Sequence, residues 1–254
     1  MPSTVIGAAA RQLVQEECLA IADALAMRPD IHVGVHNARK AIRRLRAVLA
    51  LFATDEQPLQ RSDRALQRLG RGLSALRDAH VLVDTAQSLQ AGAPASGWAP
   101  VITHLGARRD RLLQRACAQD PGFQKKRRVV RGVGLELDTQ GWELVRKADL
   151  RRALARSRRR VEKAAARARR SDDAQALHEW RRRVRRLRMQ LEVMARLDGG
   201  LVKGHSGSDG GKQAKGLHRL SDALGREQDL RLLRNHVRAM RGLQDKAELM
   251  ALAR

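Results

Sequence analysis

Two stretches of this chain place apolar and basic residues on opposite faces of a helix, in the same arrangement. In residues 35–52 the apolar side chains recur at helical intervals and occupy one half of the cylinder. The other half carries His36, Arg39, Lys40, Arg43, Arg44 and Arg46, without an acidic residue. Residues 177–194 repeat the design at a spacing of 142, with His178, Arg181, Arg182, Arg185, Arg186 and Arg188 on the basic half. A solvated helix face normally mixes charges of both signs, so two one-signed faces indicate one large anion bound between them.

Apolar periodicity and capping residues predict the other helices of the first half. A first helix runs over residues 3–27 and ends at Arg28-Pro29, because a residue before proline disfavours the α conformation. Asp30 then caps the helix of His36. Further helices are predicted over residues 58–91 and 98–119, with a Gly-, Pro- and Ser-rich loop at 92–98 between them. Residues 123–142 have a poor pattern and predict a connector with a broken helix.

The second half repeats this order of elements. Its first helix begins near Glu143, and Asp172 or Asp173 caps the helix of His178, which extends to about residue 197. Six glycines in residues 198–211 predict a flexible loop. The helix after the loop matches the third helix at a spacing of 151, and a short helix over residues 243–254 is predicted at the end.

Basic residues also recur on single lines along other predicted helices. These lines consist of Arg61, Arg64 and Arg68, of their counterparts Lys212, Lys215 and Arg219, of Arg108 and Arg111, and of Arg152, Arg156, Arg159 and Lys163. The last line continues to Arg167 and Arg170, and its six bases lie within about 80° of arc. For this line, a solvated surface and an anion-binding surface both remain open.

The pattern H-x-x-R-[KR]-x-x-R-R-x-R, which occurs at His36 and again at His178, resembles the signature of the CHAD family, the conserved-histidine α-helical domain. The resemblance implies an all-α fold of two pseudo-symmetric four-helix repeats around a basic central channel that binds inorganic polyphosphate. The whole chain, residues 1–254, would form one such domain. Repeat one would span residues 4–120, a connector 121–142 and repeat two 143–254.

Composition agrees with a helical fold and a polyanionic partner. Hydrophobic residues make up 43% of the 254 residues but aromatic residues only 2%, so Ala, Leu and Val must fill the interior. This filling suits close-packed helices better than sheets. Lys and Arg number 51 against 27 Asp and Glu, and the resulting formal charge of +24 disfavours a compact state unless a polyanion is near.

The sequence favours a cytoplasmic protein with reduced thiols. Cys18 and Cys117 are far apart and without metal-ligand or redox spacing, so we expect two thiols packed on apolar helix faces. No apolar run approaches the ~18 residues that a membrane-spanning helix needs, and the N-terminus lacks the pattern of a signal peptide. Family resemblance makes localisation at polyphosphate granules an expectation.

The two histidines leave two roles open. A metal site is disfavoured, because zinc needs three or four ligands and each histidine is surrounded by cations. Each imidazole either donates to a phosphate oxygen or belongs to the core and donates to a backbone carbonyl. Phe52 and Trp180 lie on or beside the apolar arcs, and we expect both in the core.

Non-catalytic binding of polyphosphate is the function that we predict, without cofactor, membrane or defined protein partner. From the residues alone the ligand is only a long, dense polyanion. A phosphohydrolase acting on polyphosphate is the alternative, but no acidic cluster shares the basic faces to hold the metal ions that such chemistry uses. Sequence-independent nucleic-acid binding is a further alternative, and adventitious nucleic acid is an expected contaminant.

Overall fold

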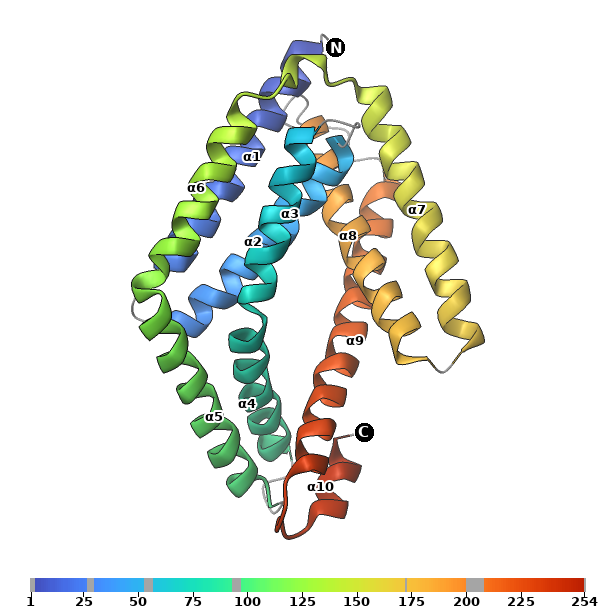
Figure 1. The fold of residues 1–254 in the computed structure, drawn as a ribbon. Helices are drawn as coiled ribbons and strands as arrows, with labels where there is room; N and C mark the ends of the chain where they lie inside the picture. The colour runs from blue at the N-terminus through green and yellow to red at the C-terminus, as the bar shows by residue number, and fades with distance from the viewer. Residues whose placement is uncertain are drawn as a thin grey trace.

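The described part of the chain is helical. A computed structural model describes residues 3–26, 30–52, 57–92, 97–171, 173–199 and 208–253. The helices in order are α1 (Ser3–Ala26), α2 (Ile31–Phe52), α3 (Gln57–Gly72), α4 (Ser74–Gly92), α5 (Trp98–Gln119), η1 (Pro121–Phe123), α6 (Gln124–Asp138), η2 (Trp142–Leu144), α7 (Lys147–Arg170), α8 (Ala174–Gly199), α9 (Ser208–Ala239) and α10 (Lys246–Leu252) (Figure 1). No strand occurs in these ranges, which confirms the all-α prediction.

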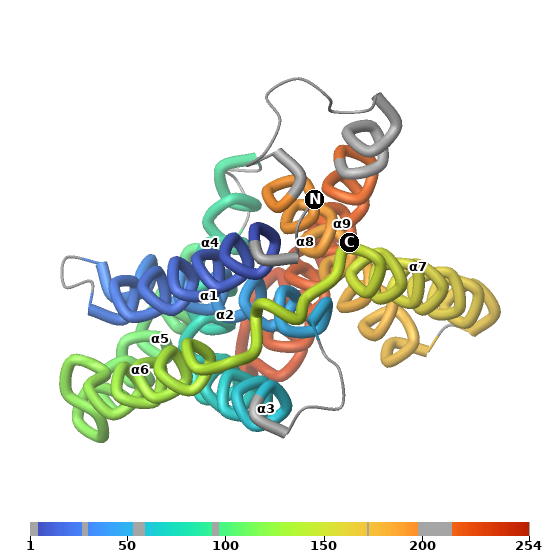
Figure 2. The backbone as a smooth tube through the Cα atoms, turned by 90° about the horizontal axis from the view of Figure 1, so that it is seen from above, coloured from blue at the N-terminus to red at the C-terminus, as the bar shows by residue number. Residues whose placement is uncertain are grey.

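The two histidine helices, α2 and α8, pack against each other in the middle of the molecule. α1 lies against α2 and α6 lies against α1, whereas α7 lies against α8 at the opposite outer edge (Figures 1 and 2). α4 and α9 also pack together, and in addition α4 contacts α5 and α9 contacts the short helix α10. The four helices α2, α4, α8 and α9 therefore converge on one region, while the other elements surround it. The pseudo-symmetry of the two halves stays a prediction.

Two apolar clusters hold these helices together. The larger cluster joins residues of α1, α2, α3, α6, α7 and α8, and the fully buried Ile21, Leu45 and Leu66 belong to it. The smaller cluster joins α4, α5, α9 and α10 around the fully buried Trp98. Phe52 is buried as expected, and its ring packs edge-on against Trp142 with 5.3 Å between centroids. Cys18 is buried and Cys117 half-buried, and both are free thiols.

Acidic side chains cap the N-termini of the two histidine helices, α2 and α8. An oxygen of the Asp30 carboxylate accepts the backbone N–H groups of His32 and Val33 at 2.9 and 3.0 Å. Asp173 accepts the backbone N–H of Gln175 at 2.9 Å. These bonds satisfy amides that have no partner within the first turn of a helix. Both predicted caps of the histidine helices are thereby confirmed, with Asp173 at the second.

The single helix predicted over residues 58–91 is wrong, because the chain breaks at Leu73 into α3 and α4. Ser74 donates its hydroxyl to the Gly70 carbonyl at 3.2 Å, and the Arg39 guanidinium of α2 donates to the same carbonyl. A side chain that inserts between carbonyls of a helix interrupts its hydrogen-bond ladder and kinks it. Helical periodicity continues across the break, so the pattern of apolar residues did not reveal it.

The connector predicted over residues 121–142 is largely a regular helix, α6. Its residues Val130, Val133 and Leu137 are buried against α1 and α3. α6 lies in contact with α1 at Gly134, where a β-carbon would be in ordinary van der Waals contact with Cys18 at 3.8 Å. Its glycines lower helix propensity, and packing on α1 offsets that loss.

Two further boundaries differ from the predictions. The last helix is Lys246–Leu252, shorter than the predicted residues 243–254. The predicted loop at 198–211 overlaps the ends of α8 and α9, and residues 200–207 lie outside the described part.

Gly7 provides a test of how closely α1 packs on η2. A β-carbon at Gly7 would lie 2.1 Å from the carbonyl oxygen of Trp142, and a backbone atom has little freedom to move away. We expect Gly7→Ala to lower the free energy of unfolding by about 3 kcal/mol, as measured by urea denaturation. The control is Gly132→Ala in α6, where the added carbon meets nothing within 4 Å and should stabilise by up to ~1 kcal/mol. Equal effects of the two changes would contradict the close contact.

Candidate functional site: a buried arginine cluster

Four arginines from α2, α4 and α8 form the centre of the molecule's basic region. Arg43 lies on α2, Arg77 on α4, and Arg181 and Arg185 on α8. We call these four residues the arginine cluster. They are close enough that Arg185, Arg77 and Arg181 each disfavour the charged form of Arg43. α2 and α8 are in direct contact beside the cluster, where Gln190 donates to the backbone carbonyl of Ala47 at 3.4 Å.

Three members of the cluster have no counter-charge in contact with them. Arg43, Arg181 and Arg185 form no hydrogen bond and no ion pair with any described residue, and Arg181 is only 7% exposed. The Nε atoms of Arg43 and Arg181 are fully buried without an acceptor. A buried charge without a partner is unfavourable by several kcal/mol in general, since neither water nor an acid solvates it. Within the described part of the chain, these three charges are therefore without a contacting counter-charge.

The pKa values of these arginines are lowered by the same cause. Burial, followed by the repulsion of Arg185, lowers the pKa of Arg43 to about 9. Burial and the repulsion of Arg181 lower the pKa of Arg185 to about 10. The pKa of Arg181 is lowered as well, mainly by burial, although Asp229 opposes the shift. A dense group of like charges in a partly dehydrated site would bind an anion strongly.

Arg77 differs from the other three because acids hold it in place. Its guanidinium donates to Asp78 at 3.2 Å and to Asp229 of α9 at 3.2 Å. The sequence analysis did not include Arg77 among the candidate site residues. The adjacent Arg-Asp pair was the available signal, and the packing of α4 against α9 adds the second acid.

His36 and His178 lie beside the cluster, and both have lowered pKa values. Partial burial and the charge of Arg43 lower the pKa of His36, with further contributions from Arg77, Lys40 and His80. Partial burial and the charge of Arg182 lower the pKa of His178, although a hydrogen bond with Gln228 opposes the shift. Both imidazoles therefore lose their proton more readily than a solvated histidine.

The sequence did not predict a second pair of histidines, which lies on the same side of the cluster as His36. The rings of His32 on α2 and His80 on α4 stack in parallel, with 4.9 Å between centroids. His80 also contributes to the lowered pKa of His36, so the pair borders the site. A spacing of four between His32 and His36 was the only sequence signal.

Other predicted site residues hold helices together through pairs that the structure defines. Arg39 donates to the hydroxyl of Ser74 at 2.7 Å and to the Gly70 carbonyl. Arg44 pairs with the buried Glu17 of α1 at 2.7 Å. Further pairs join Arg46 to Asp63 at 2.7 Å, Arg61 to Glu136 at 3.3 Å, and Arg188 to Glu192 at 3.5 Å. The acids come from other helices or other turns. Residues 35–52 have no acid of their own, and α1 and α3 supply the counter-charges of Arg44 and Arg46.

The remaining predicted residues are distributed over the surface around the cluster. Lys40, Arg64, Arg68, Arg111, Arg182, Lys215 and Arg219 are exposed, and Arg108 and Arg186 are half-buried. The side chain of Lys212 lies outside the described part. The polyphosphate-binding role of all these residues stays a prediction.

Comparison with known proteins is consistent with this geometry. Residues 5–238 match the CHAD domain. The chain belongs to the CHAD domain family. The crystal structure of the CHAD domain from the plant Ricinus communis has a similar fold, with a TM-score of 0.66 and 23% identity over 100% of this chain and 84% of that chain. At this identity the likeness concerns the fold alone. No curated protein is significantly similar in sequence.

The row of bases on α7 of this CHAD domain is separate from the arginine cluster. The buried residues of α7 are Leu150, Ala153, Leu154, Ala164 and Ala165, on one stripe. Arg152, Arg156, Arg159 and Lys163 project from the opposite side of the helix and are exposed. The sequence left a solvated and an anion-binding surface open for this row, and the burial pattern turns the row away from α8.

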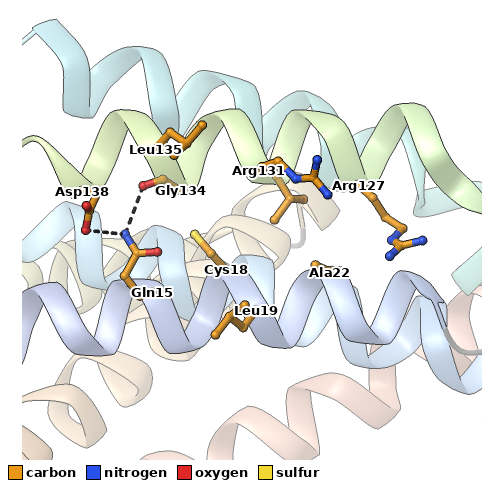
Figure 3. Close-up of a pocket in the computed structure, with 10 residues that line it drawn as sticks. Gln15, Cys18, Leu19, Ala22, Arg127, Arg131, Gly134, Leu135 and Asp138 are labelled. Carbon is orange, nitrogen blue, oxygen red and sulfur yellow. Dashed lines mark hydrogen bonds between the residues drawn. The ribbon is translucent and has the colours of Figure 1, made fainter.

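One concave region of the surface lies apart from the cluster. The groove between α1 and α6 has a volume of about 510 Å³ and is lined by Cys18, Leu19, Leu135 and neighbouring residues (Figure 3). Burial, together with the charge of Glu17, raises the pKa of the Cys18 thiol to about 11, which keeps the thiol protonated at neutral pH.

No three His, Cys, Asp or Glu side chains of the described residues lie together in a way that could hold a metal ion. None of the described helices has the length and apolar composition needed to cross a membrane.

Replacing an unpaired arginine and a paired one should have opposite effects on stability. Arg43→Met removes a buried charge without a partner and should raise the free energy of unfolding by about 1 kcal/mol in ligand-free protein at low salt. Arg46→Met removes a bidentate pair with Asp63 at 2.7 and 3.0 Å and should lower it by about 1 kcal/mol. Urea denaturation of both variants checks the signs. A loss of stability in both variants would mean that Arg43 has a counter-charge.

Proposed function

We propose that this CHAD domain binds inorganic polyphosphate at the arginine cluster, in a basic channel between α2, α4, α8 and α9. The observation that carries the proposal is a set of three guanidinium groups without hydrogen-bond or ion-pair partners among the described residues, the buried one of Arg181 and the half-buried ones of Arg43 and Arg185. An anion would supply the missing counter-charge. A guanidinium also presents two parallel N–H groups, a geometry that matches the oxygens of a phosphate.

A linear chain of phosphates suits this region better than a single phosphate. Exposed or half-buried basic side chains continue outward from the cluster at Lys40, His36, His178 and Arg182, so one extended anion would contact several groups. Aromatic residues are only 2% of the sequence, which leaves few surfaces on which a nucleobase could stack. Polyphosphate has neither bases nor sugars and requires only charge and hydrogen-bond donors. Membership of the CHAD family supports polyphosphate among the possible linear polyanions.

We further propose that binding is non-catalytic and that it serves to place the protein on polyphosphate granules. The acids nearest to the cluster, Asp78 and Asp229, are occupied by Arg77. Their role in this proposal is to position that guanidinium.

Isothermal titration with polyphosphate of defined length tests the site. Arg43→Gln and Arg185→Gln should each weaken binding by about tenfold or more, since a hydrogen bond to a charged group contributes ~1.5–3 kcal/mol. The two losses should combine to less than their sum, because both arginines contact one ligand. The control is Arg128→Gln on α6, an exposed arginine that removes the same charge far from the cluster. Fully additive losses, or an equal loss for Arg128→Gln, would overturn the proposed site.

Binding should also be coupled to protonation of His36 and His178. Their pKa values lie below the reference value in the absence of ligand, so protonation opposes folding and the free protein loses stability as the pH falls below about 6.5. A bound polyanion adds negative charge beside Arg43 and Arg182 and should raise both pKa values.

The expected result is proton uptake on binding and a higher affinity at pH 6 than at pH 8. Titration calorimetry in two buffers of different ionisation enthalpy measures the uptake. The double variant His36→Gln, His178→Gln keeps side-chain donors and should abolish the uptake while binding at pH 8 is retained. Unchanged uptake in that variant would assign the titration to other groups.

A further inference from the structure

The outer face of α7 is a strongly basic surface outside the arginine cluster. α7 carries eleven Lys and Arg residues but only two acids, Asp149 and Glu162, over 24 residues. Six of the bases form one row, on the side opposite the buried apolar stripe, and these are Arg152, Arg156, Arg159, Lys163, Arg167 and Arg170. The row extends over 19 residues of helix, and its ends are about 27 Å apart.

Helix pairing does not require this charge. α1 packs on α2 as α7 packs on α8, yet α1 carries a single base, Arg11, against Glu16, Glu17 and Asp23. A net charge of +9 on α7 (eleven minus two) contrasts with −2 on α1 (one minus three). The two outer helices have the same packing role, so the bases of α7 are an addition to that role.

The row has few partners within the protein. Arg152 pairs with Asp149 at the start of the helix. The other five bases, Arg156, Arg159, Lys163, Arg167 and Arg170, form no side-chain hydrogen bond or ion pair with the described residues. Five like charges on successive turns repel one another, and an external polyanion would relieve that repulsion.

The row is also independent of the arginine cluster. The charges that shift the pKa values of Arg43 and Arg185 belong to α2, α4, α8 and α9, and none belongs to α7. α7 turns its apolar stripe inward and lies at the outer edge of the molecule in both views (Figures 1 and 2). A ligand on the row and a ligand at the cluster would therefore lie on different sides of α8.

We propose that the outer face of α7 is a second polyphosphate-binding surface, so that one CHAD domain bridges two polyphosphate chains. The inference rests on the proposed function of the cluster. A narrow row of cations, one on each turn, fits an extended linear polyanion. The row contains no aromatic side chain on which a nucleobase could stack, and the apolar stripe that a membrane-surface helix would insert is buried against the bundle. Two surfaces on one protein convert simple binding into cross-linking.

Light scattering with polyphosphate of two lengths tests the bridging. Long chains added to the wild-type protein should produce large assemblies that dissolve again in excess polyphosphate, whereas very short chains should give only discrete complexes. The test variant replaces four bases of the row, Arg156, Arg159, Lys163 and Arg167, each by Gln, which preserves helix propensity. It should remain in small complexes with long chains at least tenfold above the concentration at which the wild type assembles.

The matched control removes the same number of charges elsewhere. It replaces the exposed Lys125, Arg127, Arg128 and Arg131 of α6 by Gln and should assemble like the wild type. Assembly of the α7 variant at wild-type concentrations would overturn the second surface, and an equal loss in the α6 control would show that only net charge matters. Loss of duplex DNA binding in the α7 variant, with assembly on polyphosphate unchanged, would assign the row to nucleic acid instead.

A separate measurement keeps this inference distinct from the function of the cluster. Titration of short polyphosphate reports the cluster, and the α7 variant should bind it with an affinity within about twofold of the wild type. The double variant Arg43→Gln, Arg185→Gln should lose most of that affinity. If this double variant binds short chains normally, the proposed function fails, whereas a failure of bridging alone leaves that titration unaffected.

Discussion

The fold is built around guanidinium charges that no described acid neutralises. Arg43, Arg181 and Arg185 lie at the junction of α2 and α8, where burial and mutual repulsion both disfavour the charged form. Such an arrangement is unfavourable for a protein without ligand, and the two apolar clusters must offset it. An anion that enters the cluster removes the repulsion and replaces the lost hydration. The charges that would bind the ligand therefore lower the stability of the free protein. A bound anion would raise the stability of the complex.

The arginines of one short motif divide into two kinds. Arg39, Arg44 and Arg46 connect α2 to the α3–α4 break, to Glu17 of α1 and to Asp63 of α3. Arg43, on the same helix, has no such partner. The paired arginines connect α2 to its neighbouring helices, whereas the guanidinium of Arg43 is left without such a contact. This division means that loss of binding after mutation of a motif arginine is not by itself a sign of ligand contact, since a paired arginine also holds a helix.

The two outer helices give the molecule electrostatically different sides. α1 is covered by α6 and is slightly acidic, whereas α7 leaves a long basic face open. A polyanion that approaches from the side of α7 meets a charged surface before it meets the cluster. Both helices pack on a histidine helix in the same way, so packing does not account for their difference in net charge.

Local pattern was sufficient for the all-α class, for the caps at Asp30 and Asp173, and for the opposition of apolar and basic residues on α2 and α8. These features depend on residues within a few turns of one another. The break at Leu73, the helical nature of α6 and the pairs of Arg39, Arg44 and Arg46 depend on partners 17 or more positions away. The membership of Arg77 in the cluster depends on α9, 152 positions away, which supplies its second acid. A basic row looks the same in the sequence whether it lines an interior or faces solvent, and only the packing of α7 on α8 distinguishes its arginines from those at the centre.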